Sequence, residues 1–139
     1  MTFEKAREII TASGGVGDLA TCANGQPRVR PMTFVVREGL KLWSSTYRQS
    51  GKMREFAVNP RVEISFTDPR KVHLRIEGIV DTSGGPEKKR ELLELNPRVR
   101  GHFPDEDDPK FVHIEIVPTS LRWTEPGFSE YHHIFPPEK

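Results

Sequence analysis

Apolar and polar residues alternate along several short stretches of the chain, and this period-two pattern is typical of half-buried β-strands. It is clearest where Val62, Ile64 and Phe66 are separated by Glu63 and Ser65. Since each such strand keeps one polar face for water, the pattern favours antiparallel over parallel pairing. The expected strands cover residues 19–23, 29–36, 40–45, 62–66, 72–76 and 112–123.

Helical spacing and helix-stopping residues predict short helices between the strands. Apolar residues recur at helical intervals over 3–13. Ser50 is suited to cap a helix that ends at Asn59-Pro60, because the residue before a proline disfavours helical geometry. A third, highly charged helix is expected over 86–95. Together these elements predict a mainly β fold, a six-stranded antiparallel barrel with short α-helices at its ends.

Two turn signals predict how neighbouring strands connect. Asn24-Gly25 is strongly favoured in two-residue hairpin turns. Glu38-Gly39 predicts a second turn, which would pair the strands on either side of it and bring Arg30 and Thr46 to one end of that hairpin. Pro31 lies inside an expected strand, where a proline indicates an edge, a bulge or the point at which the chain leaves the sheet.

The length of the chain predicts a single domain, since it has 139 residues and a mass of 15.9 kDa. We expect this domain to span 1–139, with an N-terminal helix and entry loop over 1–16 and a loosely held tail over 125–139. Hydrophobic residues make up 35% of the chain. The core is therefore modest, and a partner chain or a ligand would help to complete it.

Charge and cysteine usage exclude several classes of function. Lys and Arg number 21 against 20 Asp and Glu, a balance that argues against a broad nucleic-acid surface. The single Cys22 excludes an internal disulfide, and neither Asp105–Asp108 nor His132-His133 has the ligand spacing of a metal site. There is no membrane-length apolar run and no signal-peptide character. We therefore expect a cytoplasmic protein without a metal, nucleic-acid or membrane partner.

Cations and hydroxyls gather between residues 26 and 60 in the combination that binds phosphate groups. Arg30 and Lys52 are cationic, Thr46 and Ser50 carry hydroxyls, and Ser50 stands at the start of a predicted helix. Charge-assisted hydrogen bonds and the positive end of a helix both favour a bound phosphate. The same residues could instead be ordinary surface polar groups and a helix cap, and the pattern alone leaves both interpretations open.

Several short motifs follow one another in a recognisable order. They are Gln26-Pro27-Arg28-Val29-Arg30-Pro31-Met32, Leu42-Trp43-Ser44-Ser45-Thr46, Ser50-Gly51-Lys52, Asn59-Pro60-Arg61-Val62, Asp68-Pro69, Glu77-Gly78, Phe103-Pro104, Asp107-Asp108-Pro109 and Trp123. The set resembles the FMN-binding split-barrel family related to pyridoxamine 5′-phosphate oxidase, and its short general-stress-protein branch in particular. The similarity extends over roughly 17–123, which is nearly the whole chain.

This resemblance implies a six-stranded split barrel that forms a homodimer, with FMN bound at the subunit interface. The phosphate would be held by Arg30, Thr46, Ser50 and Lys52. The residues along the flavin ring would be Pro31, Met32, Thr33, Ser44 and Ser45. One aromatic residue, Trp123, would reach the flavin from the partner chain. No catalytic residue is assigned, although His73 and His113 are possible proton donors.

The chain departs from the oxidase pattern where the oxidase binds its substrate. Val35 stands where a substrate-contacting lysine is needed, Gly51-Lys52 replaces Arg-Lys, and the tail over 125–139 lacks a basic substrate segment. The pocket beside the flavin is therefore expected to be poor in cations, and FMN binding is better supported than oxidation of pyridoxamine 5′-phosphate.

Two functions of different classes remain open at this point. The leading one is a flavin-dependent oxidoreductase with an unknown small-molecule substrate, in which FMN carries the redox chemistry. The alternative is a non-catalytic flavin-binding or stress-related protein. A deazaflavin or haem in place of FMN is a third possibility.

Overall fold

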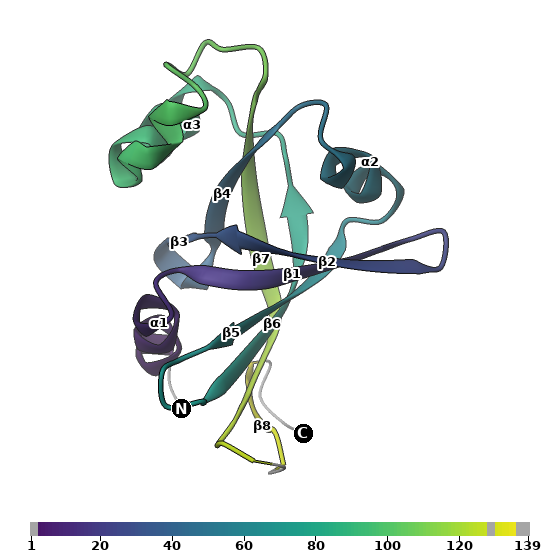
Figure 1. Ribbon diagram of the computed structural model, residues 1–139, viewed down its shortest axis with the longest axis vertical. Coiled ribbons are helices and arrows are strands. Elements are labelled where there is room, and N and C mark those ends of the chain that lie inside the picture. The colour runs from purple at the N-terminus through teal and green to yellow at the C-terminus, as the bar shows by residue number, and fades with distance from the viewer. Residues whose placement is uncertain (1–2, 128–129, 136–139) are drawn as a thin grey trace.

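The strands form one curled antiparallel sheet that wraps around the core (Figure 1). The computed structural model describes residues 3–127 and 130–135. The strands pair in the order β2-β1-β5-β6-β7-β4-β3, and β8 also pairs with β7. Their bounds are β1 (Val16–Ala23), β2 (Gln26–Thr33), β3 (Val35–Val36), β4 (Leu42–Tyr47), β5 (Arg61–Thr67), β6 (His73–Asp81), β7 (Phe111–Thr124) and β8 (His132–Phe135). The predicted mainly β, antiparallel barrel is confirmed. The strand expected over 29–36 is divided into β2 and the short β3, and β8 adds to the six expected strands.

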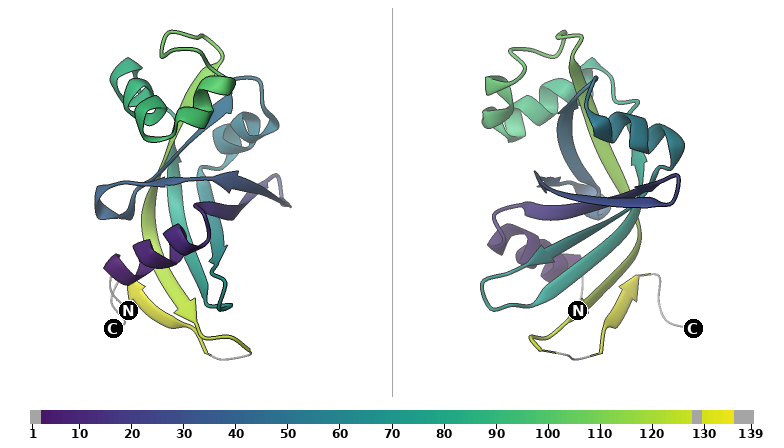
Figure 2. Two further views of the ribbon diagram at one scale, coloured as in Figure 1. Left: turned by 60° about the vertical axis from the view of Figure 1, so that its left-hand side comes forward. Right: turned by 45° about the vertical axis from the view of Figure 1, so that its right-hand side comes forward.

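Short helices lie at both ends of the curled sheet, as the sequence predicted. Figures 1 and 2 show α2 (Gly51–Val58) and α3 (Pro86–Leu95) toward one end and α1 (Phe3–Ala12) toward the other. Two single-turn 3-10 helices, η1 (Glu38–Leu40) and η2 (Pro97–Gly101), complete the connections. None of the helices in the described part of the chain has the length and apolar character needed to cross a membrane.

The hairpin predicted at Asn24-Gly25 joins β1 to β2, and its last pair is Ala23 with Gln26. Both turn residues have positive φ, 54° at Asn24 and 76° at Gly25, which is the backbone geometry of a favoured two-residue hairpin turn. β2 lies at one end of the strand order. Pro31 therefore occupies an edge strand. An edge strand tolerates a proline, because the N–H that proline lacks is not needed there to pair with a neighbouring strand.

The strand predicted over 29–36 is interrupted at Phe34, and the predicted hairpin with 40–45 is wrong beyond its turn. β3 and β4 share only the pairs Val35 with Trp43 and Val36 with Leu42. Before Phe34 the chain belongs to β2, which pairs with β1 instead. Phe34 turns inward and is 4% exposed, and its ring packs edge-on against Phe66 at 5.9 Å. The backbone N–H of Phe34 donates to the carbonyl of Gly15, just before β1, over 2.7 Å. Phe34 is thus the point at which the chain passes from pairing with β1 to pairing with β4.

Two apolar clusters hold the elements together. The larger one fills the curl of the sheet and includes Ile9 and Ile10 from α1. A second, smaller cluster fixes α3 and η2 over β4 and β7, and consists of Trp43, Leu92, Leu93, Val99, Phe103 and Phe111. This second cluster matters for function, because it positions α3 and η2 beside the cleft described below.

The tail predicted over 125–139 contains an element that the sequence did not predict. β8 pairs with the end of β7 through Leu121 with Phe135, Arg122 with His133 and Trp123 with His132. The remaining described residues of this segment, 125–127 and 130–131, connect the two strands. Within its described residues, the segment is thus attached to the sheet by a short antiparallel ladder.

Candidate functional site

A cleft of about 640 Å³ opens where the end of β2 approaches β4, the start of α2 and the α3–η2 connection. This volume lies within the usual range for small-molecule sites. Five of the ten residues that the sequence predicts for flavin binding line it, namely Met32, Thr33, Ser44, Ser45 and Lys52. Its other walls are Gly14, Phe34, Val35, Trp43, Leu92, Leu95, Asn96, Arg98, Val99 and His102.

A side-chain hydrogen bond joins β2 to β4 at the base of the cleft. Ser44 Oγ donates to the carbonyl oxygen of Thr33 over 2.8 Å. These two strands are not neighbours in the sheet, since β1, β5, β6 and β7 lie between them in the strand order. Thr33 is two residues before Val35, which pairs with Trp43 of β4. This ladder and the bond therefore bring together Met32-Thr33 and Ser44-Ser45, the two segments predicted to lie along the flavin ring.

Trp43 forms an aromatic wall of the cleft and is held on both sides. Its Nε1 donates to Glu115 Oε1 over 3.0 Å, and Lys88 Nζ lies 3.6 Å from the same carboxylate oxygen. The guanidinium of Arg37 stacks on the indole, 4.6 Å from the ring centroid, and Arg37 also forms an ion pair with Glu91 of α3. A rigid aromatic face is thus presented to whatever occupies the cleft.

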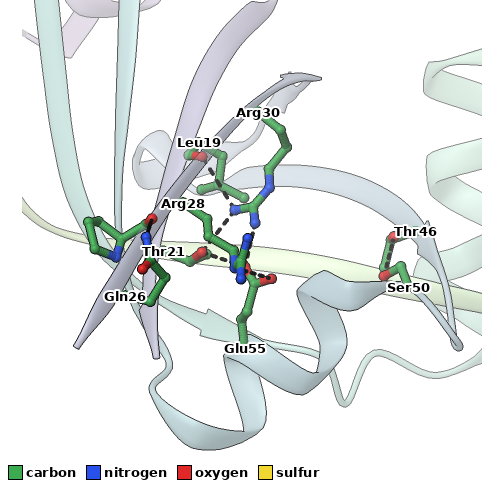
Figure 3. A network of polar contacts seen from close by, with 9 residues as sticks. Leu19, Thr21, Gln26, Arg28, Arg30, Thr46, Ser50 and Glu55 are labelled. Atoms are coloured by element: carbon green, nitrogen blue, oxygen red, sulfur yellow. Dashed lines mark hydrogen bonds and ion pairs between the residues drawn. The ribbon is translucent and has the colours of Figure 1, made fainter. Parts of the chain in front are cut away.

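Thr46 and Ser50 form the hydroxyl pair that the sequence predicted. Thr46 Oγ1 donates to Ser50 Oγ over 3.0 Å (Figure 3). Ser50 is the N-cap residue of α2 but makes no side-chain capping bond to its own helix. The pair therefore sits at the positive end of α2, next to Lys52, with a hydroxyl that is not used for capping. Neither Thr46 nor Ser50 is among the residues that line the cleft.

Lys52 is the cation that α2 contributes to the cleft. Partial burial lowers the pKa of its ammonium group, and the nearby positive charge of Arg30 lowers it further, while the carboxylate of Glu55 opposes both. Burial and the two neighbouring charges together indicate that this amine lies in a crowded, partly dehydrated environment. An anion placed in the cleft would favour the charged form of Lys52.

Arg30 does not line the cleft, although the sequence predicts it as a phosphate ligand. Its guanidinium forms an ion pair with Glu55 of α2 and donates to Thr21 Oγ1 over 3.0 Å and to the Leu19 carbonyl over 3.4 Å (Figure 3). Arg28 lies 4.0 Å from the same carboxylate and has a side chain that is 61% exposed against 20% for Arg30. Arg28 is thus the more exposed of the two arginines.

Trp123 and Pro31, the two remaining predicted residues, also lie outside the cleft. Pro31 is exposed on the edge strand β2. Trp123 is on β7 and lines a separate cleft of about 420 Å³ beside α1, together with Lys5, Asp68 and Arg70. Its indole Nε1 is buried and has no hydrogen-bond partner among the described residues. Within one chain, Trp123 therefore does not reach the cleft lined by Lys52.

The sequence analysis missed three polar residues at the rim of the cleft. Asn96, Arg98 and His102 come from the α3–η2 segment, and His102 Nδ1 is hydrogen-bonded to Tyr47 Oη at 2.9 Å. The expectation of a cation-poor pocket stays a prediction, since the lysine and arginine side chains that line the cleft are Lys52 and the exposed Arg98. Asn96 and Arg98 belong to the segment Asn-Pro-Arg-Val over 96–99, which repeats the sequence of 59–62.

Neither histidine considered as a proton donor lines the cleft. His73 is half-buried on β6. His113 on β7 is fully buried, its ring meets Trp43 edge-on at 4.5 Å, and both ring nitrogens lack a partner among the described residues. Burial, followed by the charge of Lys88, lowers its pKa from 6.5 to about 4. His113 is thus a neutral core residue behind the aromatic wall.

No group of three or more His, Cys, Asp or Glu residues is placed to hold a metal ion anywhere in 3–127 or 130–135. The polar atoms of the cleft are hydroxyls, cations and amides instead. Such a donor set suits an anionic organic ligand and not a cation.

The chain is similar to several known proteins. The family described as pyridoxamine 5′-phosphate oxidase matches residues 3–123. General stress protein 26 of Bacillus subtilis is 29% identical over 119 residues, which cover 81% of each chain. A nimC/nimA family protein from Clostridium acetobutylicum superposes with a TM-score of 0.81 at 26% identity, covering 94% of this chain and 89% of that one.

A more distant structure shares the fold alone. It is a pyridoxamine 5′-phosphate oxidase-related, FMN-binding protein from Nostoc punctiforme, with a TM-score of 0.75 and 18% identity. The alignment covers 96% of this chain and 97% of that one. The shared fold therefore extends over nearly the whole of both chains.

Proposed function

Because this chain belongs to the pyridoxamine 5′-phosphate oxidase family, we propose that it binds FMN in the cleft between the end of β2, β4 and the start of α2. The observation that carries this proposal is the convergence of Met32-Thr33, Ser44-Ser45 and Lys52 on one cleft of suitable volume. The related Nostoc punctiforme protein, which is described as FMN-binding, lends further support.

Each part of FMN has a chemically suitable counterpart here. Lys52 and the Thr46–Ser50 hydroxyl pair suit the phosphate, since they combine a cation, hydroxyl donors and a helix start. The bonded segments at Thr33 and Ser44, backed by the indole of Trp43, suit the planar ring. FMN supplies the electron-transfer chemistry when bound, and these residues bind and orient it.

We expect the protein to bind FMN more tightly than riboflavin, because riboflavin would leave Lys52 and the hydroxyl pair without their anion. Titration of the protein with each flavin, followed by quenching of flavin fluorescence, measures the two affinities. Equal dissociation constants would contradict the phosphate assignment. Mass analysis of the ligand released from freshly purified protein identifies FMN, a deazaflavin or haem directly.

We further propose that the bound flavin serves a redox reaction on a small organic substrate, so that the protein is an oxidoreductase. The exposed side chain of Leu95 at the cleft supports this, since a substrate needs access to the ring from solvent. The alternative, a stress-related protein that holds flavin without turnover, predicts a different result. Bleaching of the flavin by NADH or NADPH and its reoxidation by an added quinone would exclude the alternative.

Pyridoxamine 5′-phosphate itself is expected to be a poor substrate. Val35 contributes an apolar side chain to the cleft where the oxidase pattern requires a lysine, so that Arg98 is left to hold a second phosphate largely alone. We therefore expect aerobic turnover of this compound by FMN-loaded protein to be far below the median enzyme rate of about 10 per second. A rate near that median would show that the cleft holds a complete second phosphate site.

We also propose a homodimer with the flavin at the subunit interface. Trp123 lies in a different cleft from Lys52 in one chain, so only a second chain could bring it to the flavin. Symmetric dimers are the most frequent solution for such assemblies. Light scattering is expected to give twice the chain mass, and a monomer that retains FMN would contradict the proposed interface.

A further inference from the structure

The carboxylate of Glu55 lies at the centre of the basic cluster next to the cleft. It is on α2, one turn after Lys52, and its side chain is 14% exposed. It forms an ion pair with Arg30 and accepts a hydrogen bond of 2.5 Å from Thr21 Oγ1, and Arg28 stands 4.0 Å away (Figure 3). Lys52 is also within its electrostatic reach.

This carboxylate determines where the guanidinium of Arg30 points. Arg30 donates to Glu55, to Thr21 and to the Leu19 carbonyl, all of which lie on α2 or β1 and outside the set of residues that line the cleft. Lys52 lines the cleft, whereas Arg30 does not. An acidic residue therefore holds one of the two cations that a bound phosphate would attract.

We propose that Glu55 is an internal counter-ion that competes with the FMN phosphate for Arg30 and thereby limits the affinity of the cleft for phosphorylated flavin. This inference rests on the proposed function, because it concerns the phosphate of the same ligand. Glu55 acts here as a specificity-determining residue. Its charge weakens the binding of FMN and leaves the binding of riboflavin unaffected, because riboflavin has no phosphate.

Arg28 is placed to replace Arg30 as the ion-pair partner of Glu55. When Arg30 turns to a phosphate, the half-buried carboxylate of Glu55 needs another cation, since an unpaired charge in such a place is costly. Arg28 is on the same strand as Arg30, is largely exposed and stands 4.0 Å from Glu55, so a small side-chain movement closes the new pair. The cluster thus has one carboxylate and two interchangeable arginines.

Glu55→Gln removes the charge and keeps an oxygen that accepts from Thr21 and Arg30. We expect FMN to bind about tenfold more tightly to this variant, the order expected when one negative charge is removed from several ångströms away from a phosphate at a protein surface. Riboflavin affinity should remain within about twofold of the wild-type value, because without a phosphate the change in charge has little to act on.

The experiment compares FMN and riboflavin titrations of full-length wild-type protein, Glu55→Gln and a matched control, Glu63→Gln. Glu63 also forms an ion pair with an arginine, Arg122 at 3.2 Å, but it lies on β5 away from the cleft. The control is expected to bind both flavins as the wild type does. If wild-type protein shows no preference for FMN, the proposed function fails and this inference fails with it.

If wild-type protein prefers FMN and Glu55→Gln binds FMN no more tightly, the inference alone is overturned. Thr21→Val provides a second test should Glu55→Gln not fold. Valine has nearly the shape of threonine and suits a strand, yet it lacks the hydroxyl that donates to Glu55 and accepts from Arg30. We expect about threefold tighter FMN binding, and weaker binding would show that this network supports the phosphate site.

Discussion

Lys52→Met is expected to weaken FMN binding by about tenfold to hundredfold, because a charge-assisted hydrogen bond to a phosphate contributes roughly 1.5–3 kcal/mol. Lys52 is the cation at the start of α2 that lines the cleft. Methionine keeps most of the aliphatic length of lysine, so the packing of the side-chain stem is largely retained while the charge is lost. Fluorescence titration with FMN and riboflavin measures the effect.

Riboflavin binding to Lys52→Met should match the wild type, since riboflavin has no phosphate to lose. Lys41→Met is the control for the loss of one positive charge, because Lys41 is exposed and lies outside the cleft. It is expected to leave both affinities unchanged. Equal weakening of FMN and riboflavin by Lys52→Met would place Lys52 against the ring and not against the phosphate.

Arg30→Ala should also weaken FMN binding, but two effects would contribute to the change in affinity. The change removes a phosphate ligand and at the same time deprives Glu55 of its ion-pair partner. Arg28→Ala is expected to have the smaller effect, since Arg28 is the more exposed residue and stands farther from Glu55. Lys52 therefore provides the cleaner measure of the phosphate interaction.

Acidification from pH 6.5 to 4 is expected to lower the free energy of unfolding by about 3 kcal/mol through His113 alone. Burial lowers the pKa of its imidazole from 6.5 to about 4; Lys88 and Lys89 lower it as well, against the raising effect of Glu115 and Asp81. Between these two pKa values the unfolded chain binds a proton that the folded chain does not. The contribution is therefore fully present above pH 6.5 and is lost as the pH falls toward 4.

His113→Leu removes the titrating ring and keeps a buried side chain of similar size. Urea unfolding at a series of pH values should show a flatter dependence for this variant than for the wild type between pH 6.5 and 4. The exposed His133, on β8, provides a control as His133→Gln, which should keep the wild-type slope. Identical slopes for His113→Leu and wild type would show that the ring gains a proton acceptor or water on folding.

Residue patterns were sufficient for the elements whose causes are local. Alternation identified the strands, and Asn24-Gly25 identified the hairpin because both residues tolerate positive φ. The helix stop at Asn59-Pro60 follows from the steric restriction on the residue before a proline. For the site, the order of short motifs predicted ten residues, of which five line one cleft.

The same patterns were not sufficient where distant segments meet. The hairpin expected around Glu38-Gly39 would have placed Arg30 beside Thr46, yet β2 pairs with β1, and the chain pairs with β4 only at Val35 and Val36. The partner of Arg30, Glu55, is 25 residues away on α2 and carries no local signal of that pairing. Arg98 and His102 came to the cleft only because a second apolar cluster holds α3 and η2 there.

The amino-acid sequence alone thus determined which segments are strands and helices, and which residue types could hold a flavin phosphate. These features depend on periodicity and on backbone restrictions that act over a few residues. The tertiary structure decided which of those residues share a cleft, because the β3–β4 ladder and the second apolar cluster bring the end of β2, β4 and the α3–η2 segment together. It also decided that Arg30 is held by Glu55, since that ion pair exists only after α2 packs beside β1.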